Sequence, residues 1–220
     1  MLMSNDSLAQ RLTKLGVQMT TKPMDCTHLV AKGIVRTEKF LCAMSVSPWV
    51  LTEEWANASA KSDRLLRAFS KCNLTILGRS PRHISISFLA ERDYLLSDAA
   101  AEQKWAFKFV DAMARAKGPE GGSNLFKQMT FYVTPKVSVD AKLFKNVVSA
   151  GGGQIQTSTT PTVRILRGKA NRYVVSCPED KGIWRPLAQE GFKVYSPELV
   201  LRGALRQEIE WQNEECLVAG

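Results

Sequence analysis

The stretch formed by residues 26–55 constrains the fold more than any other part of this 220-residue chain. Residues 27–31 form a short apolar run with β-branched side chains, which is typical of a buried strand. A helix is predicted from Thr37, because apolar residues follow it at helical spacing. Residues 49–51 predict a second strand, and Thr52 begins a second helix. Strand, helix, strand and helix within about thirty residues form a βαβα unit, which predicts parallel strands.

Two cations stand at the predicted start of the first of these helices. Arg36 precedes it and Lys39 lies in its first turn, where each should cost a few tenths of a kcal/mol against the helix dipole. The free backbone N–H groups at a helix start also attract anions. The pattern therefore predicts a phosphate or carboxylate site. A solvated basic turn that tolerates the mismatch fits the same spacing.

Length and composition bound the fold and the partners. The chain is long enough for two domains of about 100 residues, each with its own core. No apolar run approaches the ~20 residues of a membrane span, and the first residues lack a secretory signal, so we expect no membrane partner. Five cysteines without a CxxC pair, and two histidines, predict no metal site and a reducing compartment. The net charge of +9 favours polyanionic surroundings such as chromatin and a weak contact with nucleic acid.

Strand and helix patterns divide the chain into two halves. In the first half we expect strands at residues 1–3 and 17–20, a helix over residues 8–15 that Gly16 ends, and a helix from Thr52 to about Leu66. In the second half we expect a helix that begins at Ser196-Pro197-Glu198. The other elements expected there are strands at residues 129–135, 172–176 and 193–195, with helices over residues 140–150 and 180–189.

The segments between the two halves have a different composition. Residues 67–97 are basic and serine-rich in their first part, and we interpret them as a variable surface loop. Residues 99–117 predict one linker helix with an apolar face, which the glycines of residues 118–122 end. The predicted boundaries are therefore 1–66 for the first unit, 67–97 for the loop, 98–124 for the linker helix and connector, and 125–220 for the second unit.

Four motifs, taken together, resemble one family. They are Thr-His-Leu-Val at 27–30, Arg-Thr-x-Lys-Phe-Leu at 36–41, Tyr-Val-Thr-Pro at 132–135 and Ser-Pro-Glu-Leu at 196–199. This combination is similar to BRCT domains, and above all to the C-terminal tandem BRCT pairs of DNA-damage mediators. The resemblance implies an α/β fold with two BRCT repeats, each a four-stranded parallel sheet flanked by helices, joined by a linker helix.

The resemblance also implies a binding site for a phosphorylated peptide. In tandem pairs the first repeat holds the phosphoserine, and the groove between the repeats reads the residue three positions later. Carried over to this chain, the phosphate-binding residues are Ser4, Asn5, Thr37 and Lys39. The pocket for the third residue or the ligand's C-terminus takes Arg36, Pro135 and Glu198.

The implied function is phosphoserine-peptide binding in the DNA damage response, with the phosphorylated C-terminal tail of the DNA-damage histone as ligand and the nucleus as location. No nucleophile elbow, metal spacing, phosphate loop or cofactor fingerprint is present in the sequence, so we expect neither an enzyme nor a cofactor. The alternative is a basic DNA- or chromatin-binding module, or a protein scaffold whose phosphate pocket is not functional. A steep fall of duplex affinity with salt would favour DNA binding.

Overall fold

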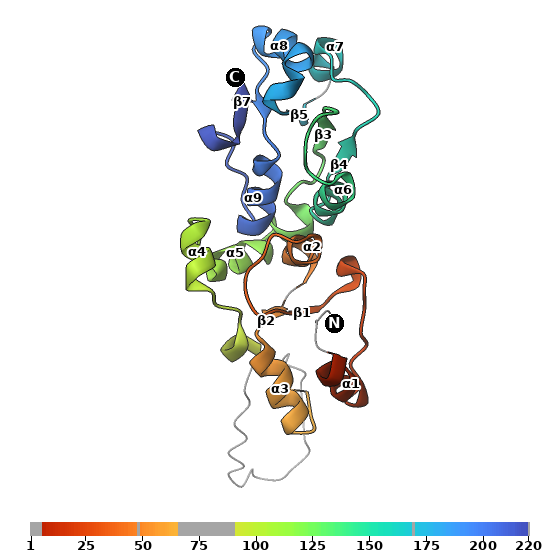
Figure 1. Ribbon diagram of the computed structural model, residues 1–220, viewed down its shortest axis with the longest axis vertical. Coiled ribbons are helices and arrows are strands. Elements are labelled where there is room, and N and C mark those ends of the chain that lie inside the picture. Colours follow the sequence, from red (N-terminus) through yellow and green to blue (C-terminus); the bar gives the residue numbers. More distant parts are fainter. Residues whose placement is uncertain (1–5, 48, 66–90, 169, 220) are drawn as a thin grey trace, which may run out of the picture.

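The two halves of the chain fold as separate repeats stacked along the long axis of the molecule (Figure 1). This computed structural model describes residues 6–47, 49–65, 91–168 and 170–219. One sheet belongs to the first repeat and another to the second, and within the described ranges no strand is shared between them. Helices alternate with strands in both repeats, so the predicted α/β class is confirmed.

The first repeat is built around the predicted βαβα unit. Its two strands pair in parallel, with Leu29 opposite Val50. The N-terminal helix packs on the last helix of the repeat and ends at the turn of Gly16, whose φ is +87°. The helices and strands are α1 (Asp6–Lys14), β1 (His28–Val30), α2 (Glu38–Val46), β2 (Trp49–Leu51) and α3 (Glu53–Lys61).

Two expectations for this repeat are wrong, and one lies outside the described residues. Residues 17–20 form no strand, because the chain leaves α1 through a hydrogen bond from Val17 N–H to Leu12 O and then turns at Thr20, whose hydroxyl accepts from Lys22 N–H. Helix α3 ends at Lys61 and not near residue 66, since the Ser62 hydroxyl bonds back to the helix carbonyls. The strand expected at residues 1–3 is not described. The described part of this sheet therefore has two parallel strands, where four were expected.

Residues 91–97, which we expected within the variable loop, pack on the first repeat. Residues Glu91–Tyr94 form a 3₁₀ turn, and Leu95 makes an antiparallel bridge with Leu51 of β2. Leu96 is buried in the core. The rest of that loop, up to residue 90, lies outside the described residues.

The linker contains two helices where the sequence predicted one. Helix α4 (Ala99–Lys104) and helix α5 (Phe109–Ala116) are separated by a break at which Ala106 has a φ of +48°. The carboxylate of Glu102 stabilises this break, because it accepts hydrogen bonds from the backbone N–H of Phe109 at 3.1 Å and from the ammonium of Lys108 at 3.0 Å. An apolar pattern at helical spacing does not reveal such a side-chain cap.

The second repeat contains a five-stranded sheet with the order β4-β3-β5-β6-β7. The first four strands of this order are parallel, as expected, and β7 is added antiparallel to β6. The predicted helix over residues 140–150 ends at the glycine turn, where Gly152 has a φ of +81°. The elements are β3 (Thr130–Val133), α6 (Ala141–Ala150), β4 (Gln154–Gln156), α7 (Val163–Arg167), β5 (Arg172–Val175), α8 (Lys181–Gln189), β6 (Val194–Tyr195), α9 (Glu198–Arg206) and β7 (Leu217–Ala219).

Three of these elements were not predicted, namely β4, α7 and β7. Strands β4 and β7 are each three residues long and lie at the two edges of the sheet, where half-buried residues give a weak alternation signal. The sequence predicts residues 193–195 as the last strand, and β7 corrects this prediction. The start of α9 also differs slightly, since Pro197 and not Ser196 is its N-cap.

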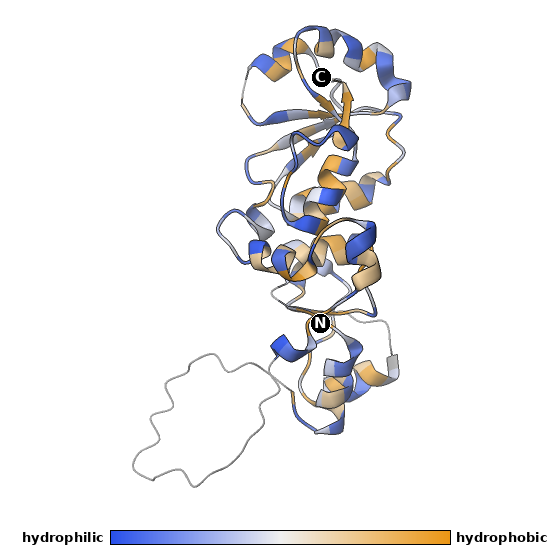
Figure 2. Cartoon of the chain, turned by 90° about the vertical axis from the view of Figure 1, so that its left-hand side faces the viewer, coloured by the Kyte–Doolittle hydropathy of each residue, from blue (hydrophilic) through white to orange (hydrophobic). Residues whose placement is uncertain are grey.

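The two repeats are joined by a helical interface in which α2 packs against α6 and α9. Figure 2 shows hydrophobic residues along the helices where the repeats meet. One buried cluster contains Leu41 and Met44 of α2, Val147 of α6 and Leu205 of α9. Leu41 and Met44 are completely buried, and each contributes roughly 1.5–3 kcal/mol of hydrophobic stabilisation. The interface therefore fixes α2 firmly on the second repeat.

A buried glutamine holds the far end of this interface. Gln207 follows α9 in a left-handed conformation, with φ +54°. Its side-chain oxygen accepts from Gly122 N–H at 2.9 Å, and its Nε2 lies 2.6 Å from Ala204 O and 3.3 Å from Ser45 Oγ at the end of α2. Linker, first repeat and second repeat are thus connected through one side chain.

Candidate functional site

The loop between β1 and α2 carries Arg36, and the first turn of α2 carries Lys39, the two cations that the sequence singled out. Thr37 is the N-cap of α2, and its hydroxyl oxygen accepts a hydrogen bond from Phe40 N–H at 3.4 Å. The Thr37 carbonyl accepts from Leu41 N–H at 2.9 Å, which begins the helix. Because Phe40 and Leu41 are buried, the helix start has a fixed position, with Thr37 and Lys39 exposed beside it.

Lys39 has an uncompensated charge at this helix start. In the described part of the chain no acidic side chain lies within 4.0 Å of its ammonium group. The backbone N–H groups of Glu38 and Lys39 donate no hydrogen bond there either. Two free N–H donors, the positive end of the helix dipole and a lysine side chain therefore coincide, which is an arrangement that suits an anion.

Arg36 and Glu198 meet across the two repeats. Nη2 of Arg36 donates to Oε1 of Glu198 at 2.8 Å, although the residues are 162 positions apart in the sequence. The Arg36 side chain is 24% exposed and that of Glu198 is 42% exposed. Within the described residues this is the only hydrogen bond of the guanidinium group, so its other N–H donors remain available to a ligand.

A further contact at this helix start was not predicted. Asn146 of α6 donates from Nδ2 to Oε1 of Glu38 at 2.7 Å, so the first turn of α2 is tied to the second repeat. Burial, and to a smaller extent the charge of Glu38, raises the pKa of the Cys42 thiol to about 12. Cys42 is therefore a core residue and not a nucleophile. The sequence offers one signal for this contact: Asn146 is a polar residue that directly precedes two inward-facing valines.

The loop that carries Arg36 is held by an acid from the linker. Asp98 is the N-cap of α4, and its two oxygens accept from Ala101 N–H and Ile34 N–H, each at 3.0 Å. These hydrogen bonds lower the pKa of Asp98, and the bond from Ala101 N–H lowers it more than the bond from Ile34 N–H does. A Cβ added at Gly33 would lie 2.8 Å from Asp98 Oδ2, so the glycine permits this close approach. Sequence reasoning assigned no role to Asp98 or Gly33.

Of the three remaining predicted site residues, the structure describes only Pro135. Pro135 is exposed at the end of β3 and lines a small pocket of about 180 Å³ together with other residues of the second repeat, such as Val137 and Ile155. Ser4 and Asn5 lie outside the described residues. Their assignment to the phosphate site therefore remains a prediction.

The second repeat has a buried acid at the corresponding helix start. Asp180 is the N-cap of α8, the helix that corresponds to α2 in the repeat order, and it is buried. Its Oδ2 accepts from Lys136 N–H at 2.9 Å. Burial raises the pKa of Asp180, but hydrogen bonds from the Thr134 hydroxyl and Lys136 N–H outweigh it and lower the pKa overall. Thr134 also bonds the buried Ser176 hydroxyl at 2.7 Å, so this helix start is filled by the repeat's own side chains.

Other kinds of site find no support in the described part of the chain. No cluster of three or more His, Cys, Asp or Glu side chains there could hold a metal ion. None of its helices is long and apolar enough to cross a membrane.

Two family models match the chain, one in each repeat. A model described as BRCT domain matches residues 124–214. The model of the Regulator of Ty1 transposition protein 107 BRCT domain matches residues 2–74. Together they cover the sheet of the first repeat and, except for β7, the sheet of the second.

Curated relatives match both repeats at once. PAX-interacting protein 1 of Bos taurus is 29% identical over 209 residues, which cover 93% of this chain and 18% of that protein. BRCT-containing protein 1 of Schizosaccharomyces pombe is 27% identical over 210 residues, covering 90% and 22%. Mediator of DNA damage checkpoint protein 1 of Homo sapiens is 27% identical over 194 residues, covering 88% and 8%. The chain thus spans less than a quarter of the length of these relatives.

Solved structures share the same arrangement. The BRCT5-BRCT6 domains of S. pombe Brc1 have a TM-score of 0.72 and 25% sequence identity, with 95% of this chain and 91% of that chain covered. A structure of Rtt107p residues 820–1070 has a TM-score of 0.60 and 12% identity, covering 98% and 86%, and shows likeness of fold alone. The chain therefore belongs to the BRCT family, as a tandem BRCT pair of the DNA-damage mediator type.

Proposed function

We propose that this tandem BRCT pair is a phosphoserine-binding module that reads the phosphorylated C-terminal tail of the DNA-damage histone in the nucleus. The observation that carries the proposal is the juxtaposition at the start of α2. A lysine and two N–H groups that have no partner among the described residues lie next to an arginine that is oriented by an acid of the other repeat.

The phosphate half of the site consists of Lys39, Thr37 and the first N–H groups of α2. A phosphoserine carries nearly two negative charges and three acceptor oxygens, so it can engage the ammonium group and the free N–H donors at the same time. In the proposal Ser4 and Asn5 complete this half with a hydroxyl and an N–H group. Phosphate binding would also relieve the unfavourable position of Lys39 near the positive end of the helix dipole.

The carboxylate half consists of Arg36 and Glu198. Glu198 holds one edge of the guanidinium group, which leaves the other donors for a ligand carboxylate. Arginine can bind a carboxylate through two parallel hydrogen bonds, which lysine cannot. A tail that ends three residues after its phosphoserine would place its free carboxylate here, with Pro135 on the second-repeat side of the groove.

The relatives support this reading of the site. They include a mediator of DNA damage checkpoint signalling, and a structure that shares the fold at a TM-score of 0.59 is described as a complex of Rtt107p with a phosphorylated histone. That structure is 12% identical, so it supports the fold's suitability for such a ligand and does not identify the ligand of this chain. We propose an interaction module and not an enzyme, and the match of both repeats to BRCT models supports this part of the proposal.

The phosphate half is tested by replacing its lysine. Lys39→Met should weaken binding of a phosphopeptide by about 10- to 150-fold, or roughly 1.5–3 kcal/mol, because a charge-assisted contact is lost. The free energy of unfolding should stay equal or rise by a few tenths of a kcal/mol, since an unfavourable charge leaves the helix start. Lys61→Met is the matched control, because Lys61 is exposed at the end of α3. Equal phosphopeptide affinity in Lys39→Met and the unmutated protein would refute the phosphate site.

The histone-tail assignment is tested with two peptides that differ only at their C-terminus. A phosphopeptide with a free carboxylate three residues after the phosphoserine should bind about 10- to 150-fold more tightly than its amidated twin. Arg36→Ala should remove most of that difference, whereas Lys39→Met should weaken both peptides alike. Equal affinity for acid and amide would mean that the ligand is an internal phosphosite, and the histone-tail assignment would fail.

A second candidate function is a DNA- or chromatin-binding module or scaffold with a non-functional phosphate pocket, which the net charge of +9 favours. Duplex DNA and the phosphopeptide can be titrated in parallel at several salt concentrations. Tight duplex binding that falls steeply with salt, without phosphate-dependent peptide binding, would favour this candidate.

A further inference from the structure

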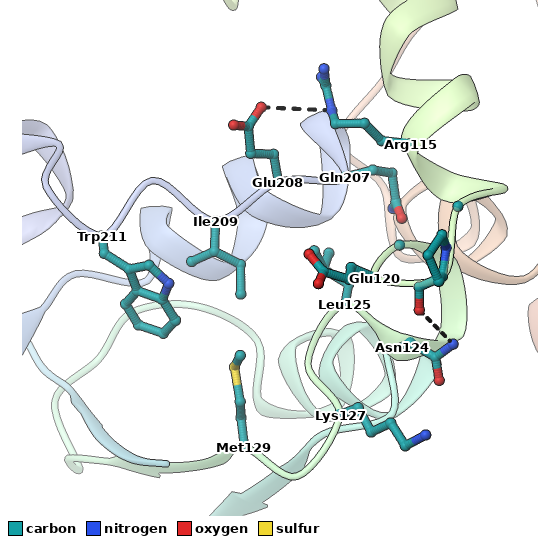
Figure 3. Close-up of a pocket in the computed structure, with 13 residues that line it drawn as sticks. Arg115, Glu120, Asn124, Leu125, Lys127, Met129, Gln207, Glu208, Ile209 and Trp211 are labelled. Carbon is teal, nitrogen blue, oxygen red and sulfur yellow. Dashed lines mark hydrogen bonds and ion pairs between the residues drawn. The ribbon is translucent and has the colours of Figure 1, made fainter. Parts of the chain in front are cut away.

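A pocket lies at the opposite end of the repeat junction from Arg36 and Glu198. We call it the linker pocket, and it measures about 670 Å³. Its walls come from the end of α5 and the loop after it, the segment that leads into β3, and the chain that leaves α9 (Figure 3). Glu198 opens α9 and Gln207 caps its end, so with a rise of about 1.5 Å per residue the two sites are separated by roughly 13 Å along this helix.

The floor of the linker pocket is apolar and partly accessible. Leu125, Met129, Ile209 and Trp211 line it, and of these only Leu125 is fully buried. The Trp211 indole is fixed by stacking on Tyr173, with ring centroids 4.4 Å apart. Its ring nitrogen faces the hollow in Figure 3, and its N–H donates no hydrogen bond within the residues that the structure describes.

The unbalanced charge on the walls is negative. Arg115 is engaged, because its Nε and Nη2 donate to Arg206 O at 3.0 and 2.8 Å and Nε lies 3.6 Å from the carboxylate of Glu208. The side chain of Lys127 points away from the floor (Figure 3). The exposed Glu120 has no ion pair in the described part of the chain, and its carboxylate points towards the hollow.

We propose that the linker pocket binds a peptide segment of a partner protein in which a large apolar side chain stands next to an arginine or lysine. The apolar side chain would cover Met129, Ile209 and Trp211, the cation would pair with Glu120, and the indole N–H would donate to a peptide carbonyl. The volume lies within the roughly 300–1,000 Å³ of ordinary ligand sites and accommodates more than one side chain. One acid without an ion pair among the described residues, beside an apolar floor, matches peptide side chains better than a highly functionalised metabolite, which needs several converging polar groups.

The pocket can be tested with three pools of acetylated, amidated hexapeptides. The first pool has Leu or Phe at the third position and Arg at the fourth, with Ala, Ser and Gly elsewhere. The second pool has Glu in place of the Arg, and the third has Ser in place of the Leu or Phe. The readout is the indole N–H resonance of Trp211 in the ¹⁵N-labelled chain, assigned with the Trp211→Phe variant.

The first pool should shift this resonance at millimolar concentration, and the second should bind about five- to tenfold more weakly because it loses one rim charge pair. The third pool should leave the resonance in place, because it cannot cover the floor. In Glu120→Gln, the ratio of the affinity for the first pool (Arg) to that for the second pool (Glu) should fall close to one. The matched control is Glu214→Gln, an exposed acid outside the pocket, which should preserve the preference. Phosphopeptide affinity should be unchanged in both variants.

The proposal is overturned if no pool moves the Trp211 resonance, or if the three pools move it equally. It is also overturned if Glu120→Gln keeps the full preference for Arg. A shift with small aromatic fragments but with none of the pools would assign the hollow to a small molecule and exclude the peptide.

Discussion

The two repeats fill the start of corresponding helices in opposite ways. At the start of α2 the first repeat exposes Lys39 and partly exposes Arg36, and two N–H groups donate no hydrogen bond to any described residue. At the start of α8 the second repeat buries the carboxylate of Asp180, which receives a hydrogen bond from Lys136 N–H. The same fold position is therefore open to an external anion in one repeat and carries the repeat's own buried carboxylate in the other. An anion site on this fold depends on which side chains occupy the helix start, and the fold alone does not determine it.

Replacement of Asp180 should have the largest effect on stability. Asp180→Ala leaves Lys136 N–H and the Thr134 hydroxyl without their charged partner, so the free energy of unfolding should fall by roughly 2–3 kcal/mol. Denaturant unfolding measures this change, with the exposed neighbour in Glu179→Ala as control. Phosphopeptide affinity of the folded variant should remain unchanged. A loss of affinity as large as in Lys39→Met would show that the two helix starts do not have separate roles.

The connection between the repeats at the start of α2 should contribute less. Asn146→Ala removes the hydrogen bond to Glu38, and a double-mutant cycle with Glu38→Ala should give a coupling of about 1 kcal/mol. Lys145→Ala, at the exposed preceding position, should show no coupling to Glu38. A coupling near zero for Asn146 would mean that this contact does not help to hold α2 on the second repeat.

The cap of α2 should contribute less still. Thr37→Ala removes the hydroxyl that accepts from Phe40 N–H, and because that bond is long and only part-buried we expect a loss of about 0.5 kcal/mol of stability. Thr52→Ala is the matched control, since Thr52 is the N-cap of α3 but makes no side-chain hydrogen bond to that helix's backbone. The contrast fails if the two threonine variants lose the same stability.

The smallest effect is a change in the pH dependence of stability at Asp98, the acid that anchors the loop before α2. The first repeat relies on Asp98 of the linker, whereas the second uses its own Asp180. Hydrogen bonds from Ala101 and Ile34 N–H lower the pKa of Asp98, so its contribution is complete above its unfolded pKa and is lost as the pH falls through the lower folded pKa. Below about pH 4, Asp98→Asn should therefore lose stability less steeply than the unmutated protein does. Parallel acid-unfolding curves would contradict this role for Asp98.

Local sequence signals predicted the fold where one residue type decides the local structure. Apolar runs located β1, β2 and β5, and glycines located the ends of α1 and α6. The break between α4 and α5 was missed because it depends on the side chain of Glu102 reaching the Phe109 N–H. Strands β4 and β7 were missed because edge strands depend on their neighbours for stability.

The family motifs predicted only those residues of the candidate site that belong to the motifs themselves. Those motifs named Arg36 and Glu198, which the structure brings to 2.8 Å from each other. They did not name Asn146 or Asp98, because these contacts depend on how the second repeat and the linker approach α2. Nor did they reveal the role of Asp180, since an acid at a helix start has an ordinary capping explanation.

The packing of α2 against α9 has a consequence for the synthesis of this protein. Helix α2 lies near residue 40, and its partner helix is complete only at Arg206. At about 5–20 residues per second, a ribosome needs roughly 10–30 s to translate the stretch between them. During that interval Leu41 and Met44 lack their final neighbours, so the emerging chain displays an apolar helix surface. We expect molecular chaperones to bind nascent chains that have passed α2 but not yet released α9.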